Sequence, residues 1–141
     1  MNRLNPFYCI VVLVLSATVA FGDTEGTTGE TDTPKLSLQS AVMCESIQGY
    51  SPVNSSVIFS ISIGKVACFS FFNPVPDKTF VEHRWYHRDK LSTTKKLSVN
   101  PPKWATYSSI QLREADKGPW RVDIIDDSGH KLETLRFSIT D

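Results

Sequence analysis

The sequence predicts an all-β fold: an antiparallel, immunoglobulin-like β-sandwich of about seven or eight strands. From Lys35 onward, short runs rich in β-branched and aromatic residues are separated by clusters of Gly, Pro, Asn and Ser. Runs of this kind are typical of strands joined by turns. No stretch of helix length carries apolar residues at a 3.6-residue period. A chain of 141 residues is long enough for one such sandwich with a real core.

The first 22 residues are predicted to be a secretory signal peptide. Arg3 is their only charged residue, an apolar run covers residues 7–21, and the small residues Ala20 and Gly22 precede Asp23. This run is shorter than the roughly 18–20 residues that span a bilayer, so cleavage near Gly22 is favoured over an uncleaved N-terminal anchor. We therefore expect an exported protein, periplasmic or secreted, with no membrane insertion after signal cleavage.

Residues 23–34 are predicted to be an acidic, disordered tether. They contain four acidic residues and no basic or large apolar residue, so burial cannot offset the entropy of ordering them. The single β-sandwich domain is expected over residues 35–141. It contains 14 basic and 11 acidic residues, and so weak a positive charge argues against nucleic acid as a partner.

The order of strands follows from the runs and the turns between them. A first strand is expected in residues 36–47, and residues 48–56, "QGYSPVNSS", are expected to form a loop. A short strand, a turn at Gly64 and a second strand are expected within 58–72. The remaining strands are expected in residues 79–88, 93–99, 104–112, 119–126 and 131–139. Between the last two, Gly129 is expected to supply the positive φ of a hairpin turn, which makes these strands neighbours.

Alternation along the strands assigns side chains to faces, because residues two apart in a strand share a face. In residues 79–88 one face is expected to carry Val81, His83, Trp85 and His87, and the other Phe80, Glu82, Arg84, Tyr86 and Arg88. In residues 119–126 the apolar face is expected to carry Trp120, Val122 and Ile124, and the opposite face Arg121, Asp123 and Ile125. Arg84 with Glu82, and Arg121 with Asp123, are candidates for cross-strand charge pairs.

Metal binding and catalysis are not expected. His83 and His87 lie four strand positions apart, about 13 Å, which is too far for joint coordination of one zinc ion. No hydrolase, phosphate-loop or metalloprotease motif is present. We therefore predict no metal, no cofactor and no enzymatic activity. A hydrolase without a recognisable motif, using His83, Asp123 and a serine, remains as an alternative.

Two cysteines, Cys44 and Cys68, remain after the signal peptide. Because thiols in an exported chain are usually oxidised, and because a structural zinc site needs four ligands, a Cys44–Cys68 disulfide is predicted. Closing this loop would stabilise the fold by about 3 kcal/mol. The alternative is two buried, reduced thiols.

Aromatic and basic residues suggest a binding surface. Trp104 follows "VNPPK" and is expected at the rim of a sheet with Tyr107 nearby, where aromatic rings suit stacking on sugars or on protein partners. The predicted surface consists of Arg84, Tyr86, Trp104, Tyr107 and Arg121. In the alternative interpretation Trp85, Trp104 and Trp120 all belong to the core.

Four blocks, "GKVACFSFF", "HRWYHRDKL", "LSVNPPKWATYSS" and "GPWRVDIIDDSGHKLETLRFSI", resemble in order the domain of unknown function 2914 family over roughly residues 40–139. The corresponding positions are Cys68, His83, Trp85, Tyr86, Trp104, Ser108, Ser109, Gly118, Trp120, Arg121, Asp126 and Gly129. Ala105 stands where the family pattern has arginine, which puts in doubt any contact made by that arginine. The resemblance implies an exported or membrane-associated bacterial β-domain with no assigned activity.

These observations together predict an exported, non-catalytic module that binds a protein or glycan partner in the cell envelope. A structural or assembly module that docks through a sheet edge is the alternative from another class.

Overall fold

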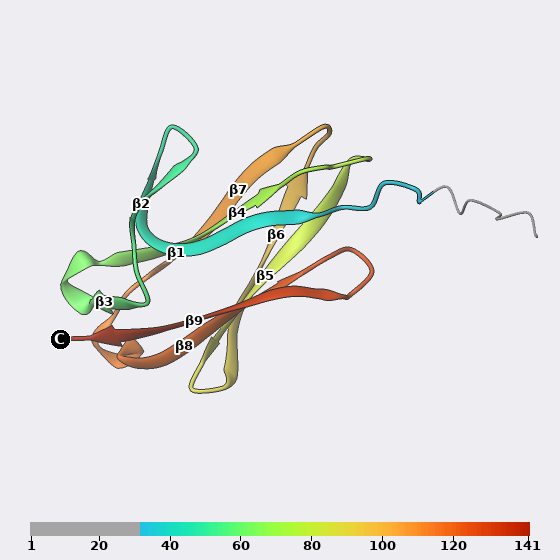
Figure 1. The fold of residues 1–141 in the computed structure, drawn as a ribbon. Helices are drawn as coiled ribbons and strands as arrows, with labels where there is room; N and C mark the ends of the chain where they lie inside the picture. Colours follow the sequence, from blue (N-terminus) through green and yellow to red (C-terminus); the bar gives the residue numbers. More distant parts are fainter. Residues whose placement is uncertain (1–31) are drawn as a thin grey trace, which may run out of the picture. The chain divides into compact units, whose positions relative to one another are not determined.

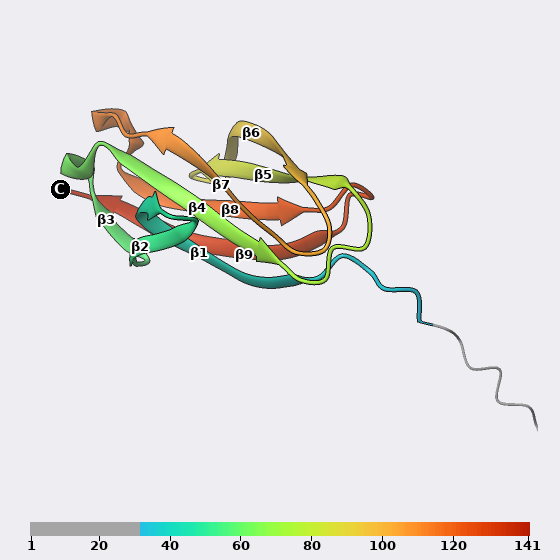
Figure 2. The ribbon, with the colours of Figure 1, turned by 90° about the horizontal axis from the view of Figure 1, so that it is seen from above.

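The computed structural model describes residues 32–141, which form two packed β-sheets (Figures 1 and 2). The predicted signal peptide and residues 23–31 of the predicted tether lie outside the described residues. Residues 32–37 lead into the first strand without regular secondary structure. In residues 32–141, no helix is long and apolar enough to cross a membrane.

Nine strands build the two sheets. The four-stranded sheet has the order β2–β1–β4–β7, made of β2 (Ser51–Ser55), β1 (Leu38–Gln48), β4 (Lys65–Phe72) and β7 (Trp104–Gln111). The five-stranded sheet has the order β3–β9–β8–β5–β6, made of β3 (Ile58–Ser60), β9 (Lys131–Thr140), β8 (Gly118–Ile125), β5 (Thr79–His87) and β6 (Lys90–Val99). Short 3₁₀ turns, Ile61–Ile63 and Glu114–Asp116, precede β4 and β8. The predicted all-β sandwich is confirmed.

The pairing is antiparallel except between β3 and β9, which run parallel. With β5, β8 and β9 adjacent in one sheet and β4 beside β7 in the other, the arrangement is that of an immunoglobulin-like sandwich. β8 and β9 are neighbours, and Gly129 in the turn between them has a φ of 87°, both as predicted.

One strand lies where the sequence predicted a loop. Gly49 and Tyr50 adopt φ values of 55° and 60° and form a two-residue turn, so the chain returns along β1 as β2. Two consecutive positive φ values are what the tight primed turns of β-hairpins require. Pro52 is tolerated because β2 is the edge strand of its sheet. The many turn residues in this segment led to the prediction of a loop, although the segment forms a hairpin turn and a strand.

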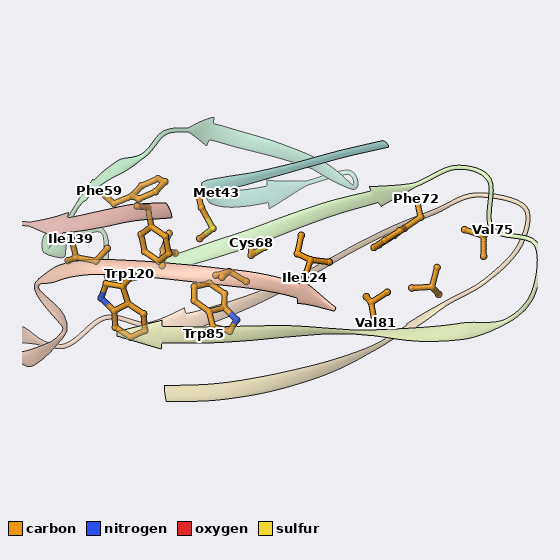
Figure 3. Packing of buried hydrophobic residues seen from close by; sticks show 14 residues of the cluster. Met43, Phe59, Cys68, Phe72, Val75, Val81, Trp85, Trp120, Ile124 and Ile139 are labelled. Carbon is orange, nitrogen blue, oxygen red and sulfur yellow. The ribbon is translucent and has the colours of Figure 1, made fainter. Parts of the chain in front are cut away.

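The core lies between the two sheets and follows the predicted alternation. Val81, His83 and Trp85 of β5 are fully buried, as are Val122 and Ile124 of β8. The rings of Trp85 and Trp120 lie among the apolar side chains of the core in Figure 3. Trp85 and Trp120 are therefore core residues, whereas Trp104 is 37% exposed.

The predicted disulfide between Cys44 and Cys68 is wrong, because both are free, buried cysteines. The register of β1 and β4 pairs Met43 with Cys68 and Cys44 with Ala67. Paired residues share a face and successive residues alternate, so the two thiols lie on opposite faces of the sheet. Cys68 packs in the main core, while Cys44 packs in a small apolar cluster on the outer face. Side chains that point apart cannot be bridged without moving the backbone.

Candidate functional site

The five residues of the predicted binding surface do not form one surface. Arg84, Tyr86 and Arg121 lie on the outer face of the five-stranded sheet, on β5 and β8. Trp104 and Tyr107 belong to β7 in the other sheet. The two groups therefore lie on different layers of the sandwich, and a partner of ordinary size would contact one group or the other.

The group on the five-stranded sheet is engaged within the protein. Arg121 stacks over the ring of Tyr86 at 4.0 Å and forms an ion pair with Asp89. Arg84 lies 2.8 Å from Glu82, and Arg121 lies 3.7 Å from Asp123. Both of these pairs run along a single strand, two residues apart, rather than across strands. Because each of these two guanidinium groups already has an acidic partner, Arg84 and Arg121 offer little unpaired charge to a ligand.

The group on β7 is more accessible. Trp104 is 37% exposed and Tyr107 is 47% exposed. Tyr107 pairs with Phe69 and faces outward, whereas Trp104 pairs with Phe72, whose side chain is in the core. Trp104 remains partly exposed because it is the first residue of an edge strand.

A pocket of about 240 Å³ lies at this end of β7, and its lining identifies a residue that the sequence did not. It is lined by Tyr50, Lys103, Trp104 and Ala105, which we call the aromatic pocket. Tyr50 lies at the tip of the β1–β2 hairpin and is 73% exposed. Two exposed aromatic side chains and one ammonium group thus surround one hollow.

The small apolar cluster on the outer face of the four-stranded sheet explains how Tyr50 reaches Trp104. Its buried members are Cys44, Ala67 and Phe69, and the partly buried Val42, Ile47, Phe71 and Ala105 pack against it. Ile47 comes from β1 immediately before the hairpin turn, and Ala105 comes from β7. Figure 1 shows β1 bending before it enters the hairpin. Packing of Ile47 therefore carries the hairpin tip toward β7.

No local signal could have found Tyr50, because its contact with the pocket depends on the bend of β1. The sequence places it in a turn, and turn residues are usually solvated. A loop tyrosine becomes a candidate contact residue only when the fold supplies a second aromatic residue beside it.

A second polar arrangement lies in the core and is built around His83. Its Nε2 atom lies 3.0 Å from Ser70 Oγ, and its Nδ1 atom lies 2.7 Å from Ser108 Oγ. Trp85 Nε1 donates to Ser108 Oγ at 3.1 Å. Burial lowers the pKa of His83 to about 4, so the imidazole is neutral at pH 7. The hydrogen-bond partners of His83 are thus two serine side chains and not backbone groups.

The donors of this network fit two orders, one for each tautomer of neutral His83. In both, Ser108 Oγ accepts from the Trp85 indole. With the imidazole proton on Nε2, the Ser108 hydroxyl donates to Nδ1 and Nε2–H donates to Ser70 Oγ. With the proton on Nδ1, Nδ1–H donates to Ser108 Oγ and the Ser70 hydroxyl donates to Nε2. Either order gives a partner to both ring nitrogens and to the indole N–H.

The His83 network has the residue types of a hydrolase site but not the access. His83 is fully buried, as is Ser70. Asp123 lies on the opposite face of the five-stranded sheet, since its register partner is Arg84 and not His83. The trio His83, Asp123 and a serine is therefore not assembled. The network consists of hydrogen bonds that connect the two sheets.

The other histidines have separate roles. His87 stacks on Trp120 with ring centroids 4.4 Å apart and lies 3.0 Å from the carbonyl oxygen of Lys117. His130 lies in the β8–β9 turn, where its backbone N–H donates to Asp126. Among residues 32–141, no group of three His, Cys, Asp or Glu side chains is arranged to hold a metal ion.

Comparison with known proteins identifies a family. The family model described as "Protein of unknown function (DUF2914)" matches residues 78–139, from the start of β5 to the end of β9. Over these residues the chain is similar to that family, and the resemblance seen in the sequence is confirmed for them. The block "GKVACFSFF" precedes the matched residues. No curated protein matches the chain.

Several of the residues that carry the resemblance meet in the interior. His83, Trp85 and Ser108 form the buried network, and Trp120 packs in the core. Asp126 accepts from the backbone N–H groups of Ser128 and His130 and so organises the hairpin turn. These positions hold the fold together, and the candidate contact residues have to be sought elsewhere.

Proposed function

We propose that this protein, which is similar to the DUF2914 family over residues 78–139, is an exported, non-catalytic binding module that holds a protein or glycan partner in the cell envelope. The observation that carries the proposal is the aromatic pocket, where Tyr50 and Trp104 come together from distant parts of the chain beside Lys103. Both rings are exposed, so each has a face available to a partner.

The chemistry of the aromatic pocket supports a glycan as the first ligand to test. Aromatic side chains offer a large apolar surface with few rotatable bonds, and their rings stack on the apolar face of a sugar. Lys103 adds a hydrogen-bond donor and a positive charge at the edge. A protein partner would use the same aromatic rings as anchors, because Trp and Tyr are enriched among the residues that dominate binding energy.

Two further observations support the other parts of the proposal. Export rests on the signal-peptide pattern of residues 1–22. The non-catalytic assignment is supported by the burial of His83, whose two serine partners belong to the core and not to an open pocket.

Tryptophan fluorescence tests the proposal directly. Trp85 and Trp120 are 0% and 5% exposed, so Trp104 is expected to account for most of the acrylamide-quenchable emission. Addition of a cell-envelope glycan preparation should protect this emission from quenching. A second arm uses a detergent-solubilised envelope protein fraction, and protection only in that arm would assign a protein partner.

The controls separate binding from folding. Tyr50→Ala should abolish the protection with little change in Tm, because this side chain is mostly exposed. Tyr107→Ala is the matched control, since Tyr107 is an exposed tyrosine in the strand that carries Trp104 and does not line the pocket. Unchanged quenching in both arms would overturn the proposal.

A further inference from the structure

One side of the sandwich ends in two incompletely paired strands. β1 pairs with β2 only from Cys44 onward, and β9 pairs with β3 only at Ser138–Thr140. Among the described residues, no strand pairs with the outer side of residues 38–42 of β1, which we call the open edge. β1 and β9 belong to different sheets, so these unpaired sides lie at the boundary between the two layers.

A groove of about 490 Å³ lies at this boundary. It is lined by Ala41, Val42 and Met43 of β1, by Ser55, Ser56 and Val57, and by Leu135 and Arg136 of β9. We call it the edge groove. Its lining is mainly apolar, and two apolar side chains at this part of the chain, Val57 and Ile58, are 65% and 61% exposed. Large exposed aliphatic residues beside an apolar groove are typical of an interaction surface.

Backbone groups of the open edge are free to pair. The carbonyl oxygen of Met43 accepts from the N–H of Ser56 at 3.2 Å, so it points away from β4. Backbone groups of residues two apart in a strand point to the same side, so the N–H and C=O of Ala41 also point away from β4. Ala41 lines the edge groove. An incoming strand would find both hydrogen-bonding groups and an apolar hollow there.

The open edge lacks the charges that usually protect such strands. Residues 38–43, "LQSAVM", contain no charged residue and no proline. Proteins commonly guard edge strands with charges, especially lysine, against pairing with another chain. The β6 edge has this protection in Lys90, Lys95 and Lys96. β7 is also uncharged, but the groove beside it is lined by Lys95, Arg113 and Asp116, which makes it polar.

The positive charge of Arg136 indicates that a strand added at the open edge would carry an acidic residue. Arg136 lies directly opposite Arg121 in the β8–β9 register, and like charges in this position destabilise a sheet. Arg121 has acidic partners in Asp89 and Asp123. None of the ion pairs within residues 32–141 includes Arg136. A carboxylate near Arg136 would offset this repulsion.

We propose that the open edge binds an extended peptide segment of a protein partner as an added strand. The segment continues the four-stranded sheet beside β1, on the side that β2 occupies farther along. Its backbone pairs with Ala41, an apolar side chain enters the edge groove, and an acidic residue faces Arg136. Main-chain hydrogen bonds supply affinity in strand addition, and the pockets for alternate side chains supply specificity.

Peptide binding tests this assignment. The probes are fluorescein-labelled eight-residue peptides of alternating Thr and Val, with Asp at each Thr position in turn and Lys in the matched series. Fluorescence polarisation with the full chain should show saturable binding of at least one Asp peptide and weaker binding of its Lys counterpart. Arg136→Glu should reverse the preference by about tenfold. Arg84→Glu, a charge reversal on the same sheet away from the groove, should leave it unchanged.

Two readouts locate the binding site on the open edge. Hydrogen exchange of the Ala41 amide should slow when the peptide binds, and Ala41→Pro should abolish binding because proline has no N–H. If Ala41→Pro fails to fold, the hydrogen-exchange measurement and the Arg136→Glu variant still test whether the peptide binds at the open edge. Absence of saturable binding, or equal binding of both series to both proteins, would overturn the proposal.

Two further measurements distinguish peptide binding at the open edge from dimerisation and from binding at the aromatic pocket. Concentration-dependent dimerisation that Val42→Lys abolishes would overturn the partner peptide in favour of a second copy of the chain at this edge. Trp104→Ala should leave peptide binding unchanged, because Trp104 does not line the edge groove. Failure of the strand-addition proposal is therefore distinguishable from failure of the aromatic pocket.

Discussion

His83 Nδ1 and Ser108 Oγ lie 2.7 Å apart in the interior and join the two sheets of the sandwich. Strand β5 contributes His83 and strand β7 contributes Ser108, so the bond crosses the apolar core. A buried polar group is costly when it lacks a partner, and this network supplies partners for an imidazole, an indole and two hydroxyl groups. The arrangement therefore favours one relative placement of the sheets.

The first prediction concerns Ser108. Ser108→Ala would leave the Trp85 indole N–H and the His83 Nδ1 atom without partners in the core. Each buried unsatisfied group costs about 1–3 kcal/mol, so we expect the loss of a partner for both groups to lower the free energy of unfolding by about 2–6 kcal/mol. Urea denaturation measures this change. Ser109→Ala, on the other face of the same strand, should change stability by less than about 0.5 kcal/mol.

The second prediction concerns the loss of folding stability at acidic pH. Burial lowers the pKa of His83 to about 4, below the value of 6.5 expected in the unfolded chain. Between these values the unfolded state binds the proton and the folded state does not, so stability rises with pH. On acidification from about pH 6.5 to 4, this histidine should remove on the order of 3 kcal/mol of stability, with no further loss from it below pH 4.

A comparison with His83→Gln isolates the contribution of this histidine from that of the carboxylates. Chemical denaturation of both proteins at a series of pH values should show a difference in stability that narrows as pH falls through this range. A constant difference between pH 7 and 4 would show that His83 titrates alike in the folded and unfolded states.

The third prediction concerns the thiols. Burial raises the pKa of both Cys44 and Cys68, which disfavours the reactive thiolate. We expect neither to react with a thiol reagent in the folded protein and both to be alkylated after unfolding without reductant. Peptide mapping by mass spectrometry checks this result. A Cys44–Cys68 linked peptide would contradict the register of β1 and β4.

The fourth prediction concerns the pair Arg121 and Arg136. Arg136→Glu replaces a like-charge pair across β8 and β9 with an opposite-charge pair, which should stabilise the fold by about 0.2–1 kcal/mol at low salt. Thermal denaturation at low and high ionic strength measures the gain, and salt should reduce it. Arg136→Gln serves as the intermediate control. A lower Tm for the Glu variant would mean that Arg136 has a stabilising contact of its own.

The pattern of residues within single strands was enough to predict the class of fold and the inward face of β5. Alternation put Val81, His83 and Trp85 on one face, and the turn composition around Gly129 predicted the last hairpin, because both signals depend on neighbouring residues only. The same signals failed at Tyr50, where a segment rich in turn residues forms a hairpin and a strand.

The tertiary structure decided everything that depends on register and bending. A one-residue offset between β1 and β4 places Cys44 and Cys68 on opposite faces, and no spacing in the sequence reports that offset. His83 obtains Ser70 and Ser108 as partners only because the sheets stack, and Tyr50 meets Trp104 only because β1 bends. The sequence alone thus determined most of the strands and their faces, β2 excepted, because a strand's period is local. Pairing, stacking and bending join residues far apart in the chain, so the disulfide, the aromatic pocket and the open edge were decided by the folded structure.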